Sequence, residues 1–287
     1  MEESPLPHPL LEAVLERLQV PRSEPNLDLL CDLYAAWCRS VPFDNILKLI
    51  AIGSGEPAIL PGSTPVDFLE SWLAHGTGGT CWSGSGALIS VLRALGFDAE
   101  RAIATMLVAP DLPPNHGSVR VILDGIPYLV DSSILFDEPI PLIANVGSGV
   151  PHPAWGVRGR WENERFHLFW RPLHQPEGFD CRFDRFGASH SEYEARYEET
   201  RAWSPFNYEL TARINRGNEV TGISFGQRVT LYGDGSVESI PVTDEEKRRF
   251  LVEEFGIDES IVAQMPADVP TPPPPGSKTA ATESAHS

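Results

Sequence analysis

The chain has 287 residues with 22 basic and 40 acidic side chains, so its formal charge at pH 7 is −18. An acidic surplus of this size argues against nucleic acid as the main partner, because neutralising phosphates requires a surplus of Lys and Arg. Hydrophobic residues make up 41% and charged residues 22%, which excludes an overall disordered chain, and the length suits about two domains of ordinary size.

The first hundred residues carry the spacing of amphipathic helices. Apolar residues predict one helix around residues 10–18 and a second over residues 25–40. The apolar stripe of the second helix includes Cys31 and Cys38, so we expect both thiols in the core. Thr64, followed by a proline and then an acid, is typical of a helix N-terminus and predicts a third helix.

A glycine-rich loop follows these helices. Residues 78–86 read Gly-Gly-Thr-Cys-Trp-Ser-Gly-Ser-Gly, and an apolar helical pattern continues to Gly96. The pattern places Cys81 in the first turn of that helix, off its apolar stripe. Free backbone N–H groups and the helix dipole favour a nucleophilic thiolate there, and the same N–H groups can hold an oxyanion. Without partners, such a loop is more often only a turn before a helix.

Beyond residue 100 the pattern changes to short runs rich in Val and Ile. The first predicted strands cover residues 102–108, 119–123 and 126–130. A two-residue turn at Asp124 and Gly125 would place His116 diagonal to Asp131 on one face of the hairpin, whereas a three-residue turn would separate them. Thiol catalysis requires a base and an acid that orients it, so Cys81, His116 and Asp131 together predict a catalytic triad.

The second half of the chain mixes strands with irregular segments. Residues 136–204 have weak periodicity and predict irregular strands and long loops. Thr243 begins a capping-box pattern, which predicts a helix with Gly256 as its C-cap. The proline-rich residues near the C-terminus cannot bury a core and predict a tail. The further strands are predicted over residues 206–214, 223–232 and 237–242.

The order and spacing of these motifs resemble the arylamine N-acetyltransferases. The matching segments are Pro42-Phe43-Asp44-Asn45-Ile46, Gly78-Gly79-Thr80-Cys81, His116 before a strand, Leu129-Val130-Asp131 at a strand end, and the closing region from Ser204 to Ile257. The resemblance implies an α+β fold with a cysteine-protease-like active-site arrangement. Its implied parts are an N-terminal helical bundle (residues 1–98), a central antiparallel β-barrel (99–203), a C-terminal α/β lid (204–265) and a disordered tail (266–287).

The resemblance also implies a reaction and its substrates. Cys81 would accept an acyl group from a coenzyme A thioester, acetyl-CoA being the expected donor, with His116 as base and Asp131 as orienting acid. The implied acceptor is a small aromatic amine or a hydrazine-like compound. We expect Phe43 and Trp82 to line the acceptor pocket, with core packing as the alternative for Phe43. We expect the substrate to approach the backbone of Gly79 closely. One of four arginines is expected to bind the phosphates of the carrier: Arg201, Arg213, Arg216 or Arg228.

Several residues depart from the family pattern. Thr77 replaces an arginine before the glycines, which leaves Asp44 without its usual partner, and Ser83 replaces an acid. Ser132 and Ser133 follow the triad acid where the family has a loop that shapes the substrate pocket. These changes spare the reacting groups and favour a divergent specificity.

The departures leave other functions open. One is an amide synthase of the macrolactam-forming type that uses a larger acyl thioester. Another is a catalytically degenerate relative that only binds a ligand. A cysteine hydrolase or transglutaminase shares the order of Cys, His and Asp, but the segment at residues 42–46 argues against it.

The sequence also bears on compartment and partners. No run approaches 18 apolar residues and the start is acidic, so we expect a cytoplasmic protein without a membrane partner. The scattered histidines and the absence of a CxxC pair predict no metal site. The oligomeric state stays open. The thiols expected to be free are Cys31, Cys38, Cys81 and Cys181.

Overall fold

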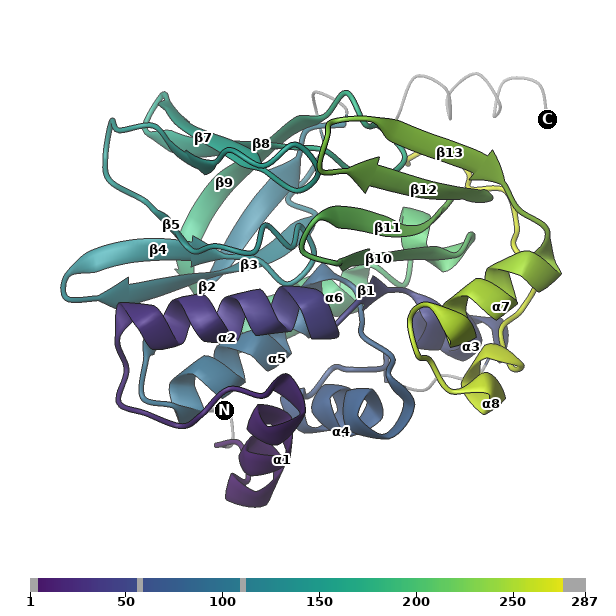
Figure 1. Cartoon of the computed structure of the whole chain (residues 1–287), viewed down its shortest axis with the longest axis horizontal. Coiled ribbons are helices and arrows are strands. Elements are labelled where there is room, and N and C mark those ends of the chain that lie inside the picture. The colour runs from purple at the N-terminus through teal and green to yellow at the C-terminus, as the bar shows by residue number, and fades with distance from the viewer. Residues whose placement is uncertain (1–4, 56–58, 109–111, 276–287) are drawn as a thin grey trace.

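The computed structural model describes residues 5–55, 59–108 and 112–275 (Figure 1). Its N-terminal part is helical, with one short strand inserted between the second and third helices. These elements are α1 (His8–Leu18), α2 (Leu27–Ser40), β1 (Phe43–Asp44), α3 (Ile46–Gly53), α4 (Pro65–His75) and α5 (Cys81–Ala94).

Helix α4 begins where the sequence predicts, whereas α3 was not predicted. The Thr64 side chain accepts a hydrogen bond from the backbone N–H of Asp67 at the start of α4, and a proline occupies the first turn. In α2, Cys38 is fully buried as predicted. Cys31 is only half-buried, so its predicted place in the core is wrong. It follows Leu30, which defines the buried face, and one residue turns a helix by about 100°.

The middle of the chain forms an antiparallel sheet in the order β5-β4-β3-β2-β9-β8-β7-β6. The edge strands β5 and β6 contact each other, so the sheet is a nearly closed barrel. The strands are β2 (Asp98–Met106), β3 (His116–Leu123), β4 (Ile126–Val130), β5 (Ile140–Pro141), β6 (Ser148–Val150), β7 (Val157–Glu162), β8 (Arg165–Trp170) and β9 (Phe179–Ala188).

The predicted hairpin between β3 and β4 is confirmed. Asp124 and Gly125 have φ angles of 51° and 76°, the left-handed pair that a two-residue turn requires. Leu123 therefore pairs with Ile126, and the register carries to Val119 opposite Val130. This register brings the start of β3 next to the end of β4, and α5 packs on β2 and β3.

The prediction for residues 136–204 is wrong in part, because this segment holds strands β5 to β9 and the helix α6 (His190–Glu199). Charged side chains on the strands conceal the apolar alternation. Arg160 of β7 pairs with Asp180 of β9 at 2.7 Å, and Arg182 of β9 lies 2.6 Å from Asp184. These pairs lie on the outward face of the strands, and in the sequence such charged residues are typical of a polar loop.

The C-terminal region builds a second antiparallel sheet in the order β1-β10-β11-β12-β13. Its first strand comes from the N-terminal part, since Phe43 of β1 pairs with Arg213. Figure 1 shows this sheet beside the barrel, with the last helices below it. The elements are η1 (Pro205–Asn207), β10 (Thr211–Asn215), β11 (Glu219–Ser224), β12 (Gln227–Tyr232), β13 (Val237–Pro241), α7 (Asp244–Glu253) and α8 (Glu259–Val262).

Three predicted boundaries in this region need correction. The strand predicted over residues 223–232 is two strands, because Phe225 and Gly226 adopt φ angles of 47° and 74° and turn the chain. The strand predicted over residues 206–214 starts with the 3-10 turn η1. The capping box at Thr243 is confirmed, but α7 ends at Glu254 as C-cap, two residues before Gly256.

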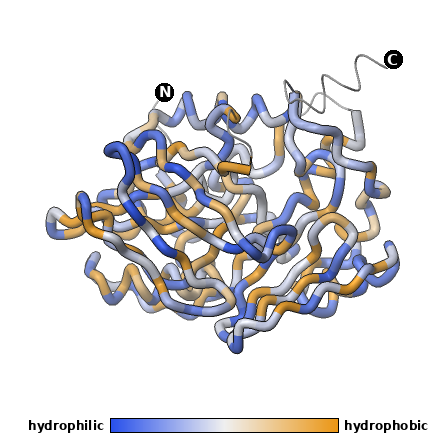
Figure 2. Tube along the Cα trace, turned by 90° about the horizontal axis from the view of Figure 1, so that it is seen from above, coloured by the Kyte–Doolittle hydropathy of each residue, from blue (hydrophilic) through white to orange (hydrophobic). Residues whose placement is uncertain are grey.

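Three buried clusters hold these layers together. The largest joins α1, α2, α4 and α5 to the barrel, and the second fills the space between β10, β11, α3 and α7. The third surrounds Cys81 and Trp82 between α5, α6 and β2. Hydrophobic and hydrophilic residues alternate along the helices and strands that enclose these clusters (Figure 2). The chain is α+β, as expected.

The boundaries proposed at residues 98, 203 and 265 stay a prediction. Strand β1 lies in the first of these parts but pairs with β10 of the third. Of the tail predicted over residues 266–287, residues 276–287 lie outside the described part. Residues 266–275 contain no helix or strand, yet they are anchored. Asp268 pairs with Lys247 at 2.5 Å and accepts a hydrogen bond from the Leu210 N–H, so this stretch is not the disordered tail that composition predicted.

Candidate active site

Cys81 is the first residue of α5 and is 4% exposed. The loop before it lies against β1, where the Gly79 carbonyl accepts a hydrogen bond from the Asp44 N–H at 3.2 Å. A Cβ on Gly78 would lie 1.7 Å from the carbonyl oxygen of Pro42, so only glycine fits there. The close backbone contact fixes where α5 begins, and with it the position of the sulfur.

The structure brings the other two predicted residues to the same place. Cys81 Sγ lies 3.9 Å from the carbonyl oxygen of Asn115, the residue before His116. His116 opens β3, and its Nε2 lies 2.7 Å from Oδ2 of Asp131, just after β4. The side chains of His116 and Asp131 are 2% and 0% exposed. The two-residue turn is therefore the alternative that holds.

The electrostatics of this group favour an ion pair. Burial alone would lower the pKa of His116, but the charge of Asp131 and hydrogen bonds to Asp131 and Cys81 outweigh burial and raise it. Burial would raise the pKa of Asp131, but the His116 charge and several hydrogen bonds keep it below its usual value. A carboxylate beside an imidazolium is the form that these shifts support.

Asp131 is held by more donors than sequence reasoning identified. Its Oδ1 accepts hydrogen bonds from the N–H and Oγ–H of Ser133 and from the N–H of Ile134, at 2.8 to 3.0 Å. The Tyr34 hydroxyl lies 3.0 Å from both the backbone N and the backbone O of Asp131. An Asp-Ser-Ser run after a strand is typical of such a turn and was a usable signal for Ser133. Tyr34 gave none, because it lies on the apolar stripe of α2.

Asp44 is satisfied without an arginine. Its Oδ2 accepts the Gly78 N–H at 2.6 Å and its Oδ1 accepts the Ile46 N–H at 3.0 Å. Burial raises the pKa of Asp44 to about 6, and these two hydrogen bonds act in the opposite direction. The Thr77 hydroxyl has no hydrogen-bond partner in the described part of the chain. The buried carboxyl thus fastens β1 to the loop that precedes the cysteine.

The three residues expected to bind substrate lie around this centre in different settings. Phe43 packs edge-on against Phe206, with ring centroids 5.1 Å apart. Trp82 packs edge-on against Tyr193 at 4.8 Å, and its indole N–H has no hydrogen-bond partner among the described residues. Gly79 lines a pocket beside the cysteine. Their role toward a substrate stays a prediction.

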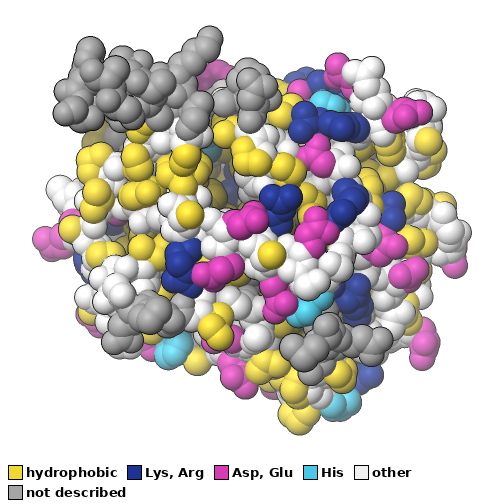
Figure 3. All heavy atoms as spheres, turned by 180° about the vertical axis from the view of Figure 1, so that it is seen from behind, with side chains coloured by type: hydrophobic (Ala, Val, Ile, Leu, Met, Phe, Trp, Pro, Cys, Tyr) yellow, Lys and Arg dark blue, Asp and Glu magenta, His cyan; other side chains and the backbone are white. Residues whose placement is uncertain are grey.

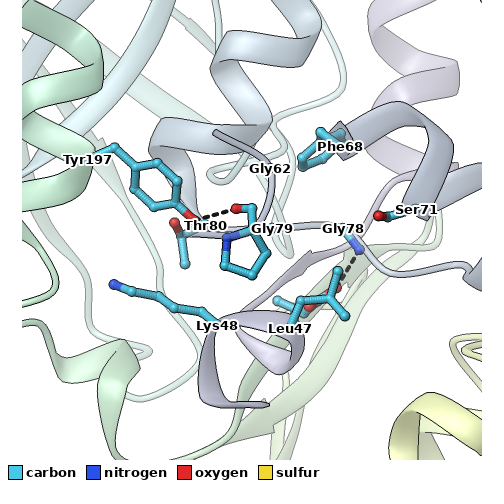
Figure 4. Close-up of a pocket in the computed structure, with 11 residues that line it drawn as sticks. Leu47, Lys48, Gly62, Phe68, Ser71, Gly78, Gly79, Thr80 and Tyr197 are labelled. Carbon is cyan, nitrogen blue, oxygen red and sulfur yellow. Dashed lines mark hydrogen bonds between the residues drawn. The ribbon is translucent and has the colours of Figure 1, made fainter. Parts of the chain in front are cut away.

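That pocket lies on the α3 side of the glycine loop and is partly open to solvent. Figure 4 shows Lys48 extending from α3 below Tyr197 and Thr80, with Phe68 and Ser71 of α4 on the opposite side. A second pocket lies over Trp82 and Tyr193, toward α6. Sequence reasoning missed Lys48, which lies at a position that looks like one more turn of an apolar helix.

The four arginines considered for a carrier's phosphates are engaged in separate contacts. Arg201 pairs with Glu198, and Arg216 donates a hydrogen bond to the carbonyl of Glu254. Arg228 lies over the Phe250 ring. The buried Arg213 donates a hydrogen bond to the Arg171 carbonyl and lies over the Trp170 ring. On the face opposite the view of Figure 1, basic and acidic side chains are interspersed (Figure 3). No single basic patch marks a phosphate site on that face.

Two kinds of feature are absent from the part of the chain that the structure describes. Within residues 5–55, 59–108 and 112–275, no group of His, Cys, Asp or Glu side chains is arranged to hold a metal ion. Over the same residues, helices of the length and apolarity needed to span a membrane are absent.

Known proteins are similar to this chain in sequence. A family model described as N-acetyltransferase matches residues 26–262. An arylamine N-acetyltransferase of Mycobacterium bovis is 29% identical over 137 residues, which are 45% of this chain and 46% of that protein. The chain thus spans about half the length of the curated relatives it matches.

Solved structures resemble the chain over a longer stretch. The arylamine N-acetyltransferase from Mycobacterium abscessus has a TM-score of 0.74 at 18% identity, covering 89% of this chain and 93% of that one. The Mycobacterium marinum arylamine N-acetyltransferase in complex with CoA also has a TM-score of 0.74, at 19% identity, covering 89% and 98%. At these identities the likeness is one of fold.

Proposed function

This chain belongs to the N-acetyltransferase family, and we propose that it moves an acyl group from a coenzyme A thioester to an amine by way of Cys81. The observation that carries this proposal is the contact of the His116–Asp131 ion pair with a cysteine at a helix N-terminus. Such a grouping supplies a nucleophile, a proton carrier and the acid that orients it.

The first half-reaction uses the ion pair as it stands. The Cys81 thiolate attacks the thioester carbonyl, and the C–S bond to coenzyme A breaks. The departing thiolate takes the proton from His116, so free coenzyme A leaves as a thiol and the acyl group remains on sulfur. Asp131 keeps the imidazole in one orientation throughout, because its Oδ1 is held by Ser133 and Ile134.

The second half-reaction restores the starting form. The amine attacks the acyl-cysteine carbonyl, His116 accepts the amine proton, and the bond to sulfur breaks. The products are the amide and the thiolate–imidazolium pair. Acetyl-CoA is the proposed donor and a small aromatic amine or hydrazine the proposed acceptor. Support comes from relatives called arylamine N-acetyltransferase and from the fold shared with one in complex with CoA.

The residues around the centre have proposed parts in binding. Trp82 and Phe43 contribute aromatic walls for an acceptor ring, and Gly79 lets the substrate approach the backbone. A larger acyl thioester, as an amide synthase uses, is the second candidate, because Ser132 and Ser133 replace the loop that shapes the family's pocket.

Intact mass spectrometry after incubation with acetyl-CoA tests the proposal. We expect the wild type to gain about 42 daltons, the mass of one acetyl group on a nucleophile. Cys81→Ala should gain nothing, whereas Cys31→Ala, which removes a more exposed thiol, should gain the same mass. Addition of 4-methoxyaniline should then remove the adduct and yield the amide.

Other outcomes separate the alternatives. Labelling by long-chain thioesters only would favour an amide synthase. If no thioester of any length labels Cys81 but a ligand raises the melting temperature, the chain is a binding protein and the proposal fails.

A further inference from the structure

Lys48 is a buried cation beside the proposed nucleophile. It lies in α3 and is 3% exposed, and its chain lines the pocket that Gly79 and Thr80 border. Nζ donates a hydrogen bond to Oγ1 of Thr200 at 2.8 Å and lies 6.0 Å from the centre of the Tyr197 ring. Figure 4 shows Lys48 and Tyr197 on the same side of this pocket, with Thr80, the residue before Cys81, between them.

No carboxylate in the described part of the chain neutralises this ammonium. Among the described residues, Nζ makes one hydrogen bond, to a hydroxyl, and no carboxylate oxygen lies within 4.0 Å of it. Glu198, the acid with the clearest influence on Lys48, is already paired with Arg201. A buried charge without a counter-charge is costly, so this position favours an anion that arrives from outside.

The remaining groups of the pocket are consistent with that reading. Asp44 also lines it, but both of its oxygens accept backbone N–H groups. The Tyr197 hydroxyl donates to the Pro61 carbonyl at 2.6 Å. Burial lowers the pKa of Lys48 to about 7, and the Cys81 charge offsets this in part. A carboxylate at Nζ would favour the charged form.

We propose that Lys48 binds a carboxylate of the substrate in this pocket, and that the enzyme therefore prefers an acyl donor or an amine that carries one. An ammonium has three donors, and two remain for the carboxylate oxygens after the hydrogen bond to Thr200. The inference rests on the proposed acyl transfer and adds the charge of the substrate to it.

Matched substrate pairs distinguish the two places where the carboxylate can sit. In the acceptor arm, 4-aminobenzoate is compared with the neutral 4-aminobenzamide, with acetyl-CoA as donor. In the donor arm, malonyl-CoA is compared with propionyl-CoA, with 4-methoxyaniline as acceptor. Both arms are measured as kcat/KM for the wild type, Lys48→Met and Lys48→Arg. Lys247→Met is the control, because Lys247 is also buried but pairs with Asp244 and Asp268.

We expect Lys48→Met to lose about tenfold to a hundredfold in kcat/KM for the anionic member of one arm, the range for a hydrogen bond to a charged group. The neutral members should change by less than about threefold, and Lys48→Arg should keep part of the preference. Lys247→Met should lower the melting temperature and leave the anionic-to-neutral ratio unchanged. Equal losses for anionic and neutral substrates, or no anionic preference in the wild type, would overturn the inference.

A binding measurement separates this inference from the proposed reaction. Calorimetric titration of Cys81→Ala with 4-aminobenzoate and with malonyl-CoA requires no chemistry. One of the two should bind about tenfold or more weakly when Lys48→Met is added. If carboxylate binding depends on Lys48 but no thioester acylates the wild type, the proposed reaction is contradicted and the role of Lys48 is supported. If the wild type is acylated but carboxylate binding does not depend on Lys48, the role of Lys48 is contradicted and the proposed reaction is supported.

Discussion

His116 Nε2 lies 2.7 Å from Asp131 Oδ2 in a setting where both side chains are almost completely excluded from water. The carboxylate is fixed from its other oxygen by Ser133 and Ile134, so the imidazole has one orientation available. With Nε2 bonded to Asp131, the other ring nitrogen, Nδ1, is left for the thiol of Cys81. The hairpin register, set by a two-residue turn, places the His116 and Asp131 side chains together.

Replacing Asp131 by asparagine should slow acyl-enzyme formation by about 10² to 10⁴. The amide matches the carboxyl in shape but cannot stabilise an imidazolium, and its NH₂ group favours the wrong tautomer. Stopped-flow acylation with acetyl-CoA measures the rate. Asp137→Asn is the control, because Asp137 is a buried acid that pairs with Arg39 at 2.5 Å; it should lower stability without this loss of rate. Similar rates for Asp131→Asn and the wild type would contradict the role of the acid.

Tyr34→Phe should destabilise the protein by about 1 to 3 kcal/mol. The hydroxyl contacts the backbone N and O of Asp131 and the N–H of Phe136, all in the core, and phenylalanine would leave these groups without a partner. Urea denaturation measures the change. Acylation should slow only modestly, because the carboxylate keeps its other donors. An unchanged midpoint would mean that the hydroxyl is not needed to satisfy this backbone.

Asp44 should give the stability a characteristic pH dependence. Its pKa is about 6 in the fold against 3.8 ordinarily, so the folded protein binds more protons between these values. The stability contribution is therefore fully present below about pH 4 and lost as the pH rises through about 6, amounting to about 3 kcal/mol. In Asp44→Asn this dependence should vanish. The free energy of unfolding, measured for both proteins from pH 4 to 7, should shift in favour of the variant as the pH rises.

The two glycines at positions 78 and 86 should respond oppositely to alanine. A Cβ on Gly78 would meet the Pro42 carbonyl at 1.7 Å, so Gly78→Ala should cost about 3 kcal/mol or more and displace the loop before Cys81.

Gly86 in α5 has nothing within 4 Å of an added Cβ, and alanine is the better helix former there. Gly86→Ala should therefore stabilise by about 0.5 to 1 kcal/mol and leave acylation unchanged. Thermal unfolding of the two variants checks both signs. Destabilisation by Gly86→Ala would show that α5 is packed more tightly along this face than the structure indicates.

The sequence predicts structure well where residues close together in the chain determine the local backbone geometry. The cap at Thr64, the turn at Asp124 and Gly125 and the capping box at Thr243 need only neighbours in sequence, and all three are confirmed. The hairpin register in turn places His116 beside Asp131, which is why that pair could be predicted. The turn at Phe225 was missed, because an aromatic residue in a sequence is typical of a strand, whereas here it adopts a φ angle of 47°.

Features that depend on distant segments could not be predicted. The charged strands β7 to β9 become recognisable only when their Arg and Asp partners face each other across the sheet. Lys48 becomes notable only when α6 brings Thr200 and Tyr197 to it, about 150 residues later in the chain. Tyr34 likewise supports Asp131 from a helix about 97 positions away.

The pairing of Phe43 with Arg213 bears on how this protein is made. When the segment that carries Cys81 leaves the ribosome, β10 has not yet been synthesised, because the Arg213 codon lies some 170 codons after that of its partner Phe43. Strand β1, which lies among the early helices, therefore stays unpaired until β10 has been synthesised. Nascent chains truncated before β10 should accordingly be unable to be acylated, and acylation of Cys81 should begin only after β10 has been synthesised.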